Sequence, residues 1–306
     1  MFNKESSELA LIKKNKGFRF SDKWISWILI LPCIIVIFML SLYPLFFAIS
    51  ESTRYHVLSD PMNQKFIGAD NYRKALNDYQ VSTATKRTIL FTGEALILEL
   101  LLGLIIALFL NKKFFGQGIV KALLFIPMSC SPLAIGLIWR TMYHPEFGVI
   151  TFFANFLGFE GTNFLGNRAT AMNSLVVFEV WQWAPFVGIL ILAGLASLSR
   201  EPFEAAAVDG ASKWAIFSRI TFPMLVPIIF IAFLLRLLDL IRYYDGIYAL
   251  TMGGPGTATE TLTWFLYKIG FKYMDMGYSA AVAIIFLFIV VILSILSIKQ
   301  VAKYCN

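Results

Sequence analysis

The side chains with the most chemical potential in this sequence are charged groups that interrupt long apolar segments. Arg236, Asp239 and Arg242 follow one another at intervals of three residues, so a helix would place their opposite charges on one face. Charged groups are costly inside a bilayer and usually face other protein groups or a water-filled path. We therefore expect these residues either to pair between helices or to contact a polar substrate or a gate, and the spacing alone leaves both roles open.

Aromatic and polar groups occur together in two of the apolar segments. A sugar site requires flat rings for the apolar sugar faces and hydrogen-bonding groups for the hydroxyls. The run Trp181-Gln182-Trp183 supplies both kinds. Pro185 and Gly188 are expected to loosen that helix and expose backbone groups to a ligand. Packing between helices is the alternative role of the two tryptophans. The candidate residues for a substrate path are Trp181, Gln182, Trp183, Gly188, Arg236, Asp239, Tyr243, Tyr244 and Asp245.

Residues for catalysis, metal binding or nucleotide binding do not form a recognisable set. A phosphate-binding loop needs spaced glycines followed by Lys and by Ser or Thr, and no such sequence occurs. The glycine-rich run at residues 253–256 is followed by no Lys, and Pro255 has no amide hydrogen, so we expect a turn there. The two His and three Cys show no spacing typical of a metal site. We thus expect no catalytic residue, no metal and no cofactor in this chain.

Composition indicates the class of protein. Of the 306 residues, 58% are hydrophobic and only 15% are charged, whereas soluble domains carry about 25% charged residues. Long continuous apolar runs cross a bilayer as helices, because other backbone structures would leave polar groups unpaired in lipid. The net charge of +7 does not indicate nucleic-acid binding, because the basic residues flank the apolar runs. We expect an all-α, multi-pass membrane protein with six transmembrane helices near residues 24–49, 88–110, 119–141, 171–197, 224–246 and 279–298.

Lysine and arginine are most frequent on the cytoplasmic side of membrane proteins. They are dense in the arm before residue 24, near residues 111–121, in the loop 198–223 and in the C-terminal tail. This distribution favours both the N and C termini in the cytoplasm, with residues 1–23 as an arm and residues 24–306 as one six-helix domain. The external loops contain basic residues as well, among them Lys86 and Arg87. The first apolar run is about 26 residues long, which favours an uncleaved span over a signal peptide.

The loop 198–223 is polar and rich in helix-forming residues, although it lies between two apolar spans. Ser199 is suited to cap a helix, Pro202 to its first turn, and Glu204 to the positive end of its dipole. Gly210 permits a turn, after which a second short helix can form. We expect a compact helix–turn–helix at the inner face of the membrane.

The spacing within this loop resembles a known signature. Glu204-Ala205-Ala206, three further residues, Gly210, nine further residues and Ile220-Thr221-Phe222-Pro223 are similar to the EAA loop of permease subunits in ATP-binding-cassette (ABC) importers, with Phe222 where Leu is usual. Residues 66–73 and 138–150 resemble loops of carbohydrate permeases. Residues 244–262 resemble the first of the two permease subunits in maltose-type sugar importers, although the large external insertion of the maltose permease itself is missing.

The resemblance implies a type I ABC importer permease fold, located in the cell inner membrane. It implies that the loop forms a coupling helix seated on a cytoplasmic ATPase, with Glu204 helping to hold that ATPase and Gly210 making the turn. The implied partners are a second homologous permease, two ATP-binding subunits that hold ATP and Mg²⁺, an external solute-binding protein and a sugar. The chain itself would not be an enzyme. The residues assigned to coupling are Glu204, Ala205, Ala206, Asp209, Gly210, Ile220 and Pro223.

Other functions stay open at this point. Arg236 and Arg242 leave room for an acidic sugar or a glycerol phosphate, although a neutral di- or oligosaccharide is our first choice. An ion-coupled secondary carrier would use Glu94, Glu99 or Asp239 as its proton site. A membrane enzyme or receptor scaffold is a third class, and the lack of a catalytic set argues against it.

Overall fold

The computed structural model describes residues 22–159 and 161–305, which divide in sequence into two compact units after Glu51. The predicted N-terminal arm, apart from its last two residues, lies outside the described residues. The first unit is one helical stretch made of α2 (Asp22–Ile37), the π-helical η1 (Phe38–Leu42) and α3 (Tyr43–Ser52). From Trp27 onward its side chains are mostly apolar and exposed. The first predicted span is therefore confirmed as a helix long and apolar enough to cross a membrane.

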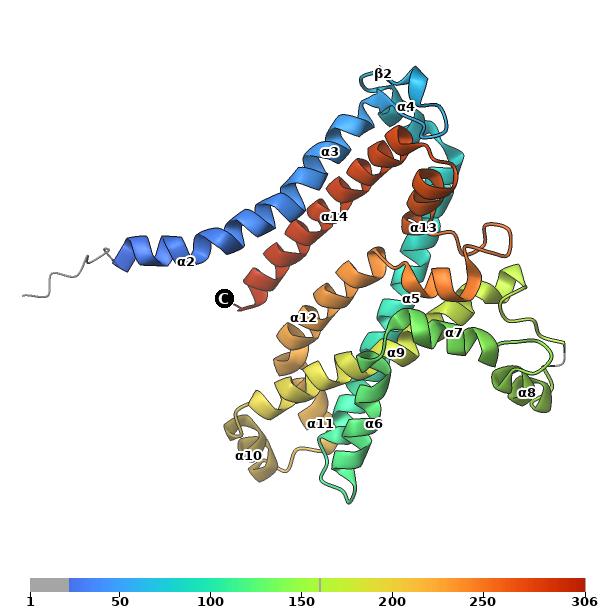
Figure 1. Ribbon diagram of the computed structural model, residues 1–306. Helices are drawn as coiled ribbons and strands as arrows, with labels where there is room; N and C mark the ends of the chain where they lie inside the picture. The colour runs from blue at the N-terminus through green and yellow to red at the C-terminus, as the bar shows by residue number, and fades with distance from the viewer. Residues whose placement is uncertain (1–21, 160, 306) are drawn as a thin grey trace, which may run out of the picture. The chain divides into compact units, whose positions relative to one another are not determined.

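The second unit is almost entirely helical (Figure 1). A small antiparallel hairpin of β1 (Arg54–Tyr55) and β2 (Lys65–Phe66) comes first. The short 3-10 helix η2 (Pro61–Asn63) lies within the hairpin, and the elements η3, η4 and η5 are π-helical. The helices that follow are α4 (Asp70–Asn77), α5 (Tyr79–Leu110), α6 (Gln117–Ser129), α7 (Pro132–Met142), α8 (Val149–Phe156), α9 (Arg168–Ser197), α10 (Glu201–Val208), α11 (Lys213–Ile216), η3 (Phe217–Thr221), α12 (Phe222–Ile241), η4 (Ile247–Thr251), α13 (Leu262–Tyr267), η5 (Lys268–Lys272) and α14 (Met276–Cys305).

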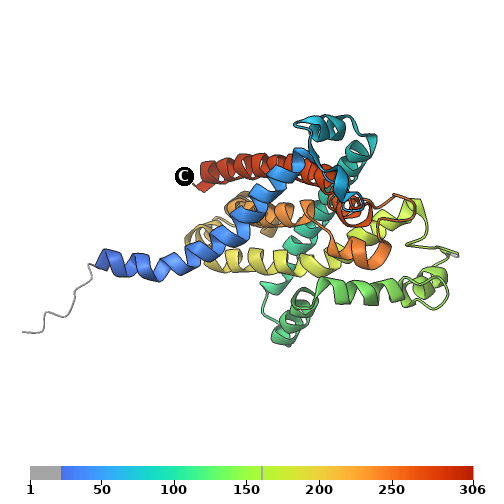
Figure 2. The same ribbon diagram turned by 45° about the horizontal axis from the view of Figure 1, so that its top comes forward.

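Three long helices, α5, α9 and α12, form the centre of this unit, and Figure 2 shows α9 alongside α12 from a second direction. Glycines allow α5 and α9 to approach closely. A Cβ atom at Gly103 would lie 2.5 Å from Cγ1 of Val187, and one at Gly188 would lie 2.7 Å from Cγ2 of Ile106. Small residues permit such close contact between helix backbones in membranes. Gly188 therefore serves helix packing, and α9 continues as a helix through Pro185 rather than loosening there.

The third predicted span differs from a single helix. Residues 119–141 form two helices, α6 and α7, that are bent by 98° at a short break. Pro132 occupies the first turn of α7, and a proline disfavours helical backbone at the residue before it. Ser131 is accordingly extended, with ψ of 125°, and the chain changes direction there. The prediction of one continuous helix over residues 119–141 was therefore wrong, because the chain breaks before Pro132.

The fifth predicted span, residues 224–246, is shifted toward the N-terminus. A continuous helical stretch begins at Lys213, inside the predicted loop, and ends at Ile241. Arg242 leaves the helix with φ of −95° and ψ of 13°. Tyr243, Tyr244 and Asp245 therefore lie in the connection that follows α12, and their prediction as part of the span was wrong. The remaining predicted spans are confirmed as α5, α9 and α14.

Candidate functional site

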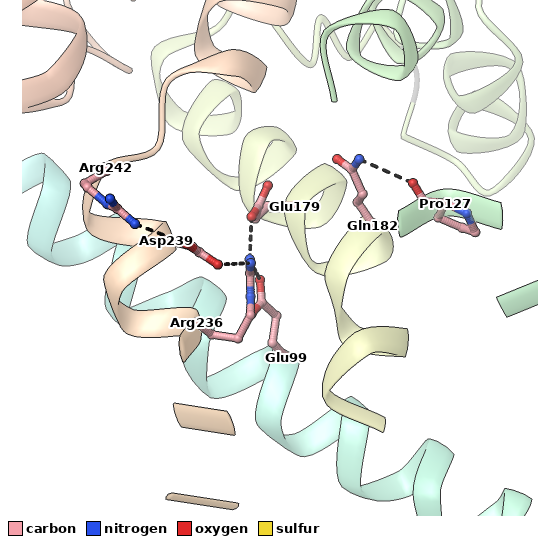
Figure 3. A network of polar contacts seen from close by, with 7 residues as sticks. All are labelled: Glu99, Pro127, Glu179, Gln182, Arg236, Asp239 and Arg242. Carbon is pink, nitrogen blue, oxygen red and sulfur yellow. Dashed lines mark hydrogen bonds and ion pairs between the residues drawn. The ribbon is translucent and has the colours of Figure 1, made fainter. Parts of the chain in front are cut away.

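A buried cluster of charged residues joins the three central helices. Arg236 of α12 is only 1% exposed, and its guanidinium binds Glu99 of α5 with both groups side by side: Nε to Oε2 is 2.7 Å and Nη2 to Oε1 is 2.9 Å. The same Nη2 donates to Oε1 of Glu179 on α9 at 2.6 Å. Figure 3 shows the two carboxylates converging on this one side chain. Arg236 thus holds α5, α9 and α12 together.

The geometry of this cluster compensates for its burial. Glu99 and Glu179 are 0% and 2% exposed, and charges at such depth are tolerated only when they are paired and hydrogen-bonded. The paired arrangement of Arg236 and Glu99 is the strongest geometry available to an arginine and a carboxylate. Removing one member of a buried pair costs about 3–5 kcal/mol, because the other charge is left without its partner.

The charged ladder expected along α12 is confirmed and continues the cluster outward. Nη1 of Arg236 lies 3.5 Å from Oδ2 of Asp239, and Nη2 of Arg242 lies 3.4 Å from Oδ1 of the same aspartate. The side chains of Asp239 and Arg242 are 53% and 60% exposed. Exposed ion pairs of this length contribute little to stability. Because Asp239 contacts both Arg236 and Arg242, this row of charges connects the buried cluster to the exposed surface.

A hollow of about 160 Å³ opens at this end of the cluster, at the C-terminal end of α12. Six of the predicted substrate-path residues line it: Trp183, Arg236, Asp239, Tyr243, Tyr244 and Asp245. Cζ of Arg236 lies over the Trp183 ring, 4.6 Å from the ring centroid, which is a cation–π contact. Pro132 and Arg242 also line the hollow, and Pro132 comes from the break between α6 and α7. Aromatic faces and charged hydrogen-bonding groups therefore meet in one place.

The tyrosines at the hollow act as neutral phenols. Burial raises the pKa of Tyr243 well above its usual value, and nearby Glu179 raises it further. Burial, followed by the neighbouring Tyr267 hydroxyl, raises the pKa of Tyr244 to about 12. Both groups are protonated at neutral pH, so each can donate one hydrogen bond and accept others.

Three predicted residues of the path do not reach this hollow. Trp181 packs against Trp139, with ring centroids 5.0 Å apart, and lines a separate apolar hollow beside α6. Gln182 is fully buried and donates from Nε2 to the carbonyl of Pro127 at 3.3 Å, which ties α9 to α6. Gly188 lies at the crossing with α5. Trp181 and Gln182 face away from the hollow that Trp183 lines, because successive residues of a helix point about 100° apart.

Glu99 and Glu179 were absent from the predicted set of path residues. Glu99 was considered as a proton site of an ion-coupled carrier. A carboxylate inside an apolar span is the signal that could have found both residues. The spacing rule that found the ladder applies only within one helix. The partners of Arg236 come from helices 57 and 137 residues away in sequence.

The loop predicted to couple to an ATPase is a helix–turn–helix, as expected. The turn between α10 and α11 has Gly210 in the left-handed region with φ of 71°. Pro202 lies in the first turn of α10, but the N-cap is Arg200, without a side-chain cap, so the capping role expected for Ser199 was wrong. Ser212 instead caps α11 by accepting a hydrogen bond from the amide of Ala215 at 3.2 Å.

The residues predicted to couple to an ATPase lie on α10, on the turn after it and, for Ile220 and Pro223, on η3 and the start of α12. Glu204, Ala205, Asp209, Gly210 and Pro223 are exposed, whereas Ala206 and Ile220 are half-buried. Two large apolar side chains nearby are also open to the surroundings, Val208 at 88% and Trp214 at 73% exposure. Figure 1 places α10 and α11 at one end of α9.

Residues 99–301 match the family described as "Binding-protein-dependent transport system inner membrane component". The chain is 38% identical to the "Probable ABC transporter permease protein y4oQ" of Sinorhizobium fredii, over 76% of this chain and 75% of that protein. It is 32% identical to the "Trehalose/maltose transport system permease protein MalF" of Thermococcus litoralis, over 90% and 92% of the two chains.

A solved structure shares the fold. One chain of a bacterial alginate ABC transporter, in complex with an alginate pentasaccharide-bound periplasmic protein, superimposes with a TM-score of 0.79 and 21% identity, covering 90% of this chain and 93% of that one. The prediction of an importer-permease fold is thereby confirmed.

Proposed function

Because the chain belongs to the family of binding-protein-dependent transport system inner membrane components, we propose that it is the permease subunit of an ABC importer for a sugar. The related permease from T. litoralis is named for trehalose and maltose. The observation that carries the proposal is the helix pair α10–α11, whose turn and spacing fit a coupling element, at the end of helices that lead to an aromatic and polar hollow.

The coupling surface supports a protein partner on α10 and α11. Val208 and Trp214 expose apolar surface that would be in contact with water unless a partner protein covered it. Glu204 is also exposed and precedes Val208 by one helical turn of α10. In our proposal a cytoplasmic ATPase covers this surface, and two such subunits bind the ATP and Mg²⁺ that energise the importer.

Two helices carry a movement of this loop to the hollow. α9 leads from the hollow to α10, and the continuous stretch from Lys213 to Ile241 leads back to it. About 18 residues separate Glu179 from the end of α9, a distance of roughly 27 Å along the helix. Because Arg236 locks α5, α9 and α12 together, closure of the ATPase pair would move them as one body. The hollow would then alternate between outward- and inward-facing access, with a second permease completing the path.

The charges at the hollow favour a neutral sugar. Arg236 is saturated by Glu99 and Glu179, and Arg242 is paired with Asp239. The lining acids Glu179, Asp239 and Asp245 outnumber the lining cations Arg236 and Arg242 by three to two. An anionic sugar or a glycerol phosphate would meet a net negative surface with no unpaired guanidinium in the hollow.

Transport in proteoliposomes tests this function. The complete importer would be reconstituted with its solute-binding protein, and uptake of labelled maltose, trehalose and glycerol 3-phosphate would be measured with ATP inside. We expect one of the two sugars to accumulate only with ATP, and the accumulation to persist when an uncoupler abolishes the proton gradient. Uptake without ATP that collapses with the proton gradient would contradict the proposal and support an ion-coupled carrier.

A further inference from the structure

A glycine-rich loop between η4 and α13, here called the ridge, lies against the first residue of α9, whereas α10 follows the other end of that helix. Its backbone enters the left-handed region at Met252, Gly253 and Gly256. Thr259 holds the loop closed: its hydroxyl donates to the carbonyl of Gly254 at 2.8 Å and lies 2.7 Å from the hydroxyl of Thr251. A loop fixed by its own hydrogen bonds is suited to present a preformed surface.

Two guanidinium groups line a polar hollow of about 350 Å³ on one side of this ridge. Arg87 of α5 is half-buried, and its Nη2 donates to the hydroxyl of Thr257 at 3.1 Å. Arg168, the first residue of α9, lies against the loop at Gly256, where a Cβ atom would be 2.7 Å from its Nη2. The absence of a side chain at Gly256 thus admits the arginine.

The charge of this hollow is not neutralised within the described part of the chain. Glu260 also lines it, but both of its carboxylate oxygens lie 2.7 Å from Nζ of Lys268, so its charge is already balanced. Among residues 22–159 and 161–305, neither Arg87 nor Arg168 forms an ion pair within 4.0 Å. The hollow therefore presents two positive charges.

A third guanidinium lies on the other side of the ridge. Arg140, at the end of α7, is exposed and lines a hollow of about 310 Å³ together with Thr251, Gly254 and Pro255 of the same loop. The ridge is thus flanked by arginines contributed by α5, α7 and α9. Such an array suits a protein surface that carries several carboxylates, since Arg binds carboxylates with paired hydrogen bonds.

The position of the arginines identifies the side of the membrane. α9 contains 30 residues, so Arg168 at its start and α10 beyond its end are roughly 45 Å apart along the helix. If α10 faces the cytoplasmic ATPase, the ridge faces outward. Arg87, Arg140 and Arg168 would then face a soluble partner on that side.

We propose that the ridge at residues 251–260, with Arg87, Arg140 and Arg168, is the docking surface for acidic side chains of the external solute-binding protein. This inference rests on the proposed function, because the solute-binding protein is the soluble partner on the outer side. The structurally similar alginate transporter is likewise found in complex with a periplasmic protein. Docking here would place the sugar above the helices that carry the hollow.

Binding measurements on the complete importer test the proposal. The importer in lipid nanodiscs would be immobilised, and binding of its sugar-loaded solute-binding protein would be followed at about 50 mM and about 300 mM NaCl. At low salt, the double variant Arg87→Gln/Arg168→Gln is expected to bind about tenfold more weakly than the wild type. At high salt, the difference in affinity between the variant and the wild type should be smaller. The conservative variant Arg168→Lys should retain most of the salt dependence.

Lys86→Gln is the matched control, because Lys86 is exposed on the same turn of α5 and lies outside both hollows. Affinity and salt dependence of the double variant equal to those of Lys86→Gln would overturn the docking surface alone. A wild-type importer that does not bind the solute-binding protein would overturn it together with that part of the proposed function. Scrambling residues 203–212 removes the coupling surface but not the ridge, so binding should survive that change.

Discussion

Replacing Arg236 by methionine is the sharpest perturbation of the structure. The variant keeps an unbranched apolar stem but removes the guanidinium with its three charged hydrogen bonds to Glu99 and Glu179. Two buried carboxylates would then lie close together without a cation, at a cost of about 3–5 kcal/mol. A domain of this size shifts its melting temperature by roughly 2–4 °C for each kcal/mol. We expect a decrease on the order of 10 °C.

Thermal unfolding of the detergent-purified protein, followed by tryptophan fluorescence, measures this effect. Arg242→Met is the matched control, because Arg242 is exposed and forms one ion pair of 3.4 Å with Asp239. Pairs of this kind contribute about 0–1 kcal/mol, so the control should melt within about 3 °C of the wild type. If Arg236→Met melts at the same temperature as Arg242→Met, the cluster does not hold the helices together and the reasoning is refuted.

A triple variant separates unpaired charge from lost packing. Glu99→Gln/Glu179→Gln/Arg236→Met removes all three buried charges at once, and complete replacement of a buried ion pair is often nearly neutral. The triple variant should therefore regain more than half of the melting temperature lost by Arg236→Met. A triple variant that melts as low as the single variant would show that the volume of Arg236, rather than its charge, is what matters.

Three further outcomes follow from the geometry. Gly103→Ala should lower the melting temperature by several degrees, because its Cβ would collide with α9, whereas Gly93→Ala on the same helix has open space and should melt at or slightly above the wild-type temperature. Trp183→Leu should reduce sugar uptake about tenfold, which corresponds to the binding free energy of one aromatic stacking contact. Trp181→Leu should leave uptake nearly unchanged, because Trp181 lines a different hollow. Gly210→Ala places a side chain at φ of 71°; with a strain of about 1 kcal/mol, it should weaken copurification of the ATPase severalfold and spare binding of the solute-binding protein.

The sequence was sufficient for those features of the fold that depend on local composition. Apolar runs of span length predict the helices, and Gly210 between helix-forming residues predicts the turn between α10 and α11. The break between α6 and α7 was harder to predict. Pro127 and Pro132 both lie in that run. α6 continues through Pro127, whereas the chain breaks just before Pro132, which begins α7. Tertiary packing decides between a kink and a break, and a single sequence does not contain it.

The site was predictable along each helix but not between helices. Spacing of three residues placed Arg236, Asp239 and Arg242 on one face, and the structure confirms the contacts between them. The partners of Arg236 on α5 and α9 depend on how the three helices cross, which is set by the close approach of Gly103 and Gly188. Composition near Trp181 and Trp183 could not tell which ring faces the hollow, because that depends on the rotation of α9.

In our proposal, energy enters this chain through α10 and α11 from a partner ATPase. The most direct test is ATP-driven sugar uptake by the reconstituted importer whose residues 203–212 have been scrambled at constant composition, with copurification of the ATPase measured on the same preparation. We expect the scrambled importer to lose both the ATPase and uptake, while it still binds the solute-binding protein and melts near the wild-type temperature. Undiminished uptake with the ATPase still assembled would contradict it.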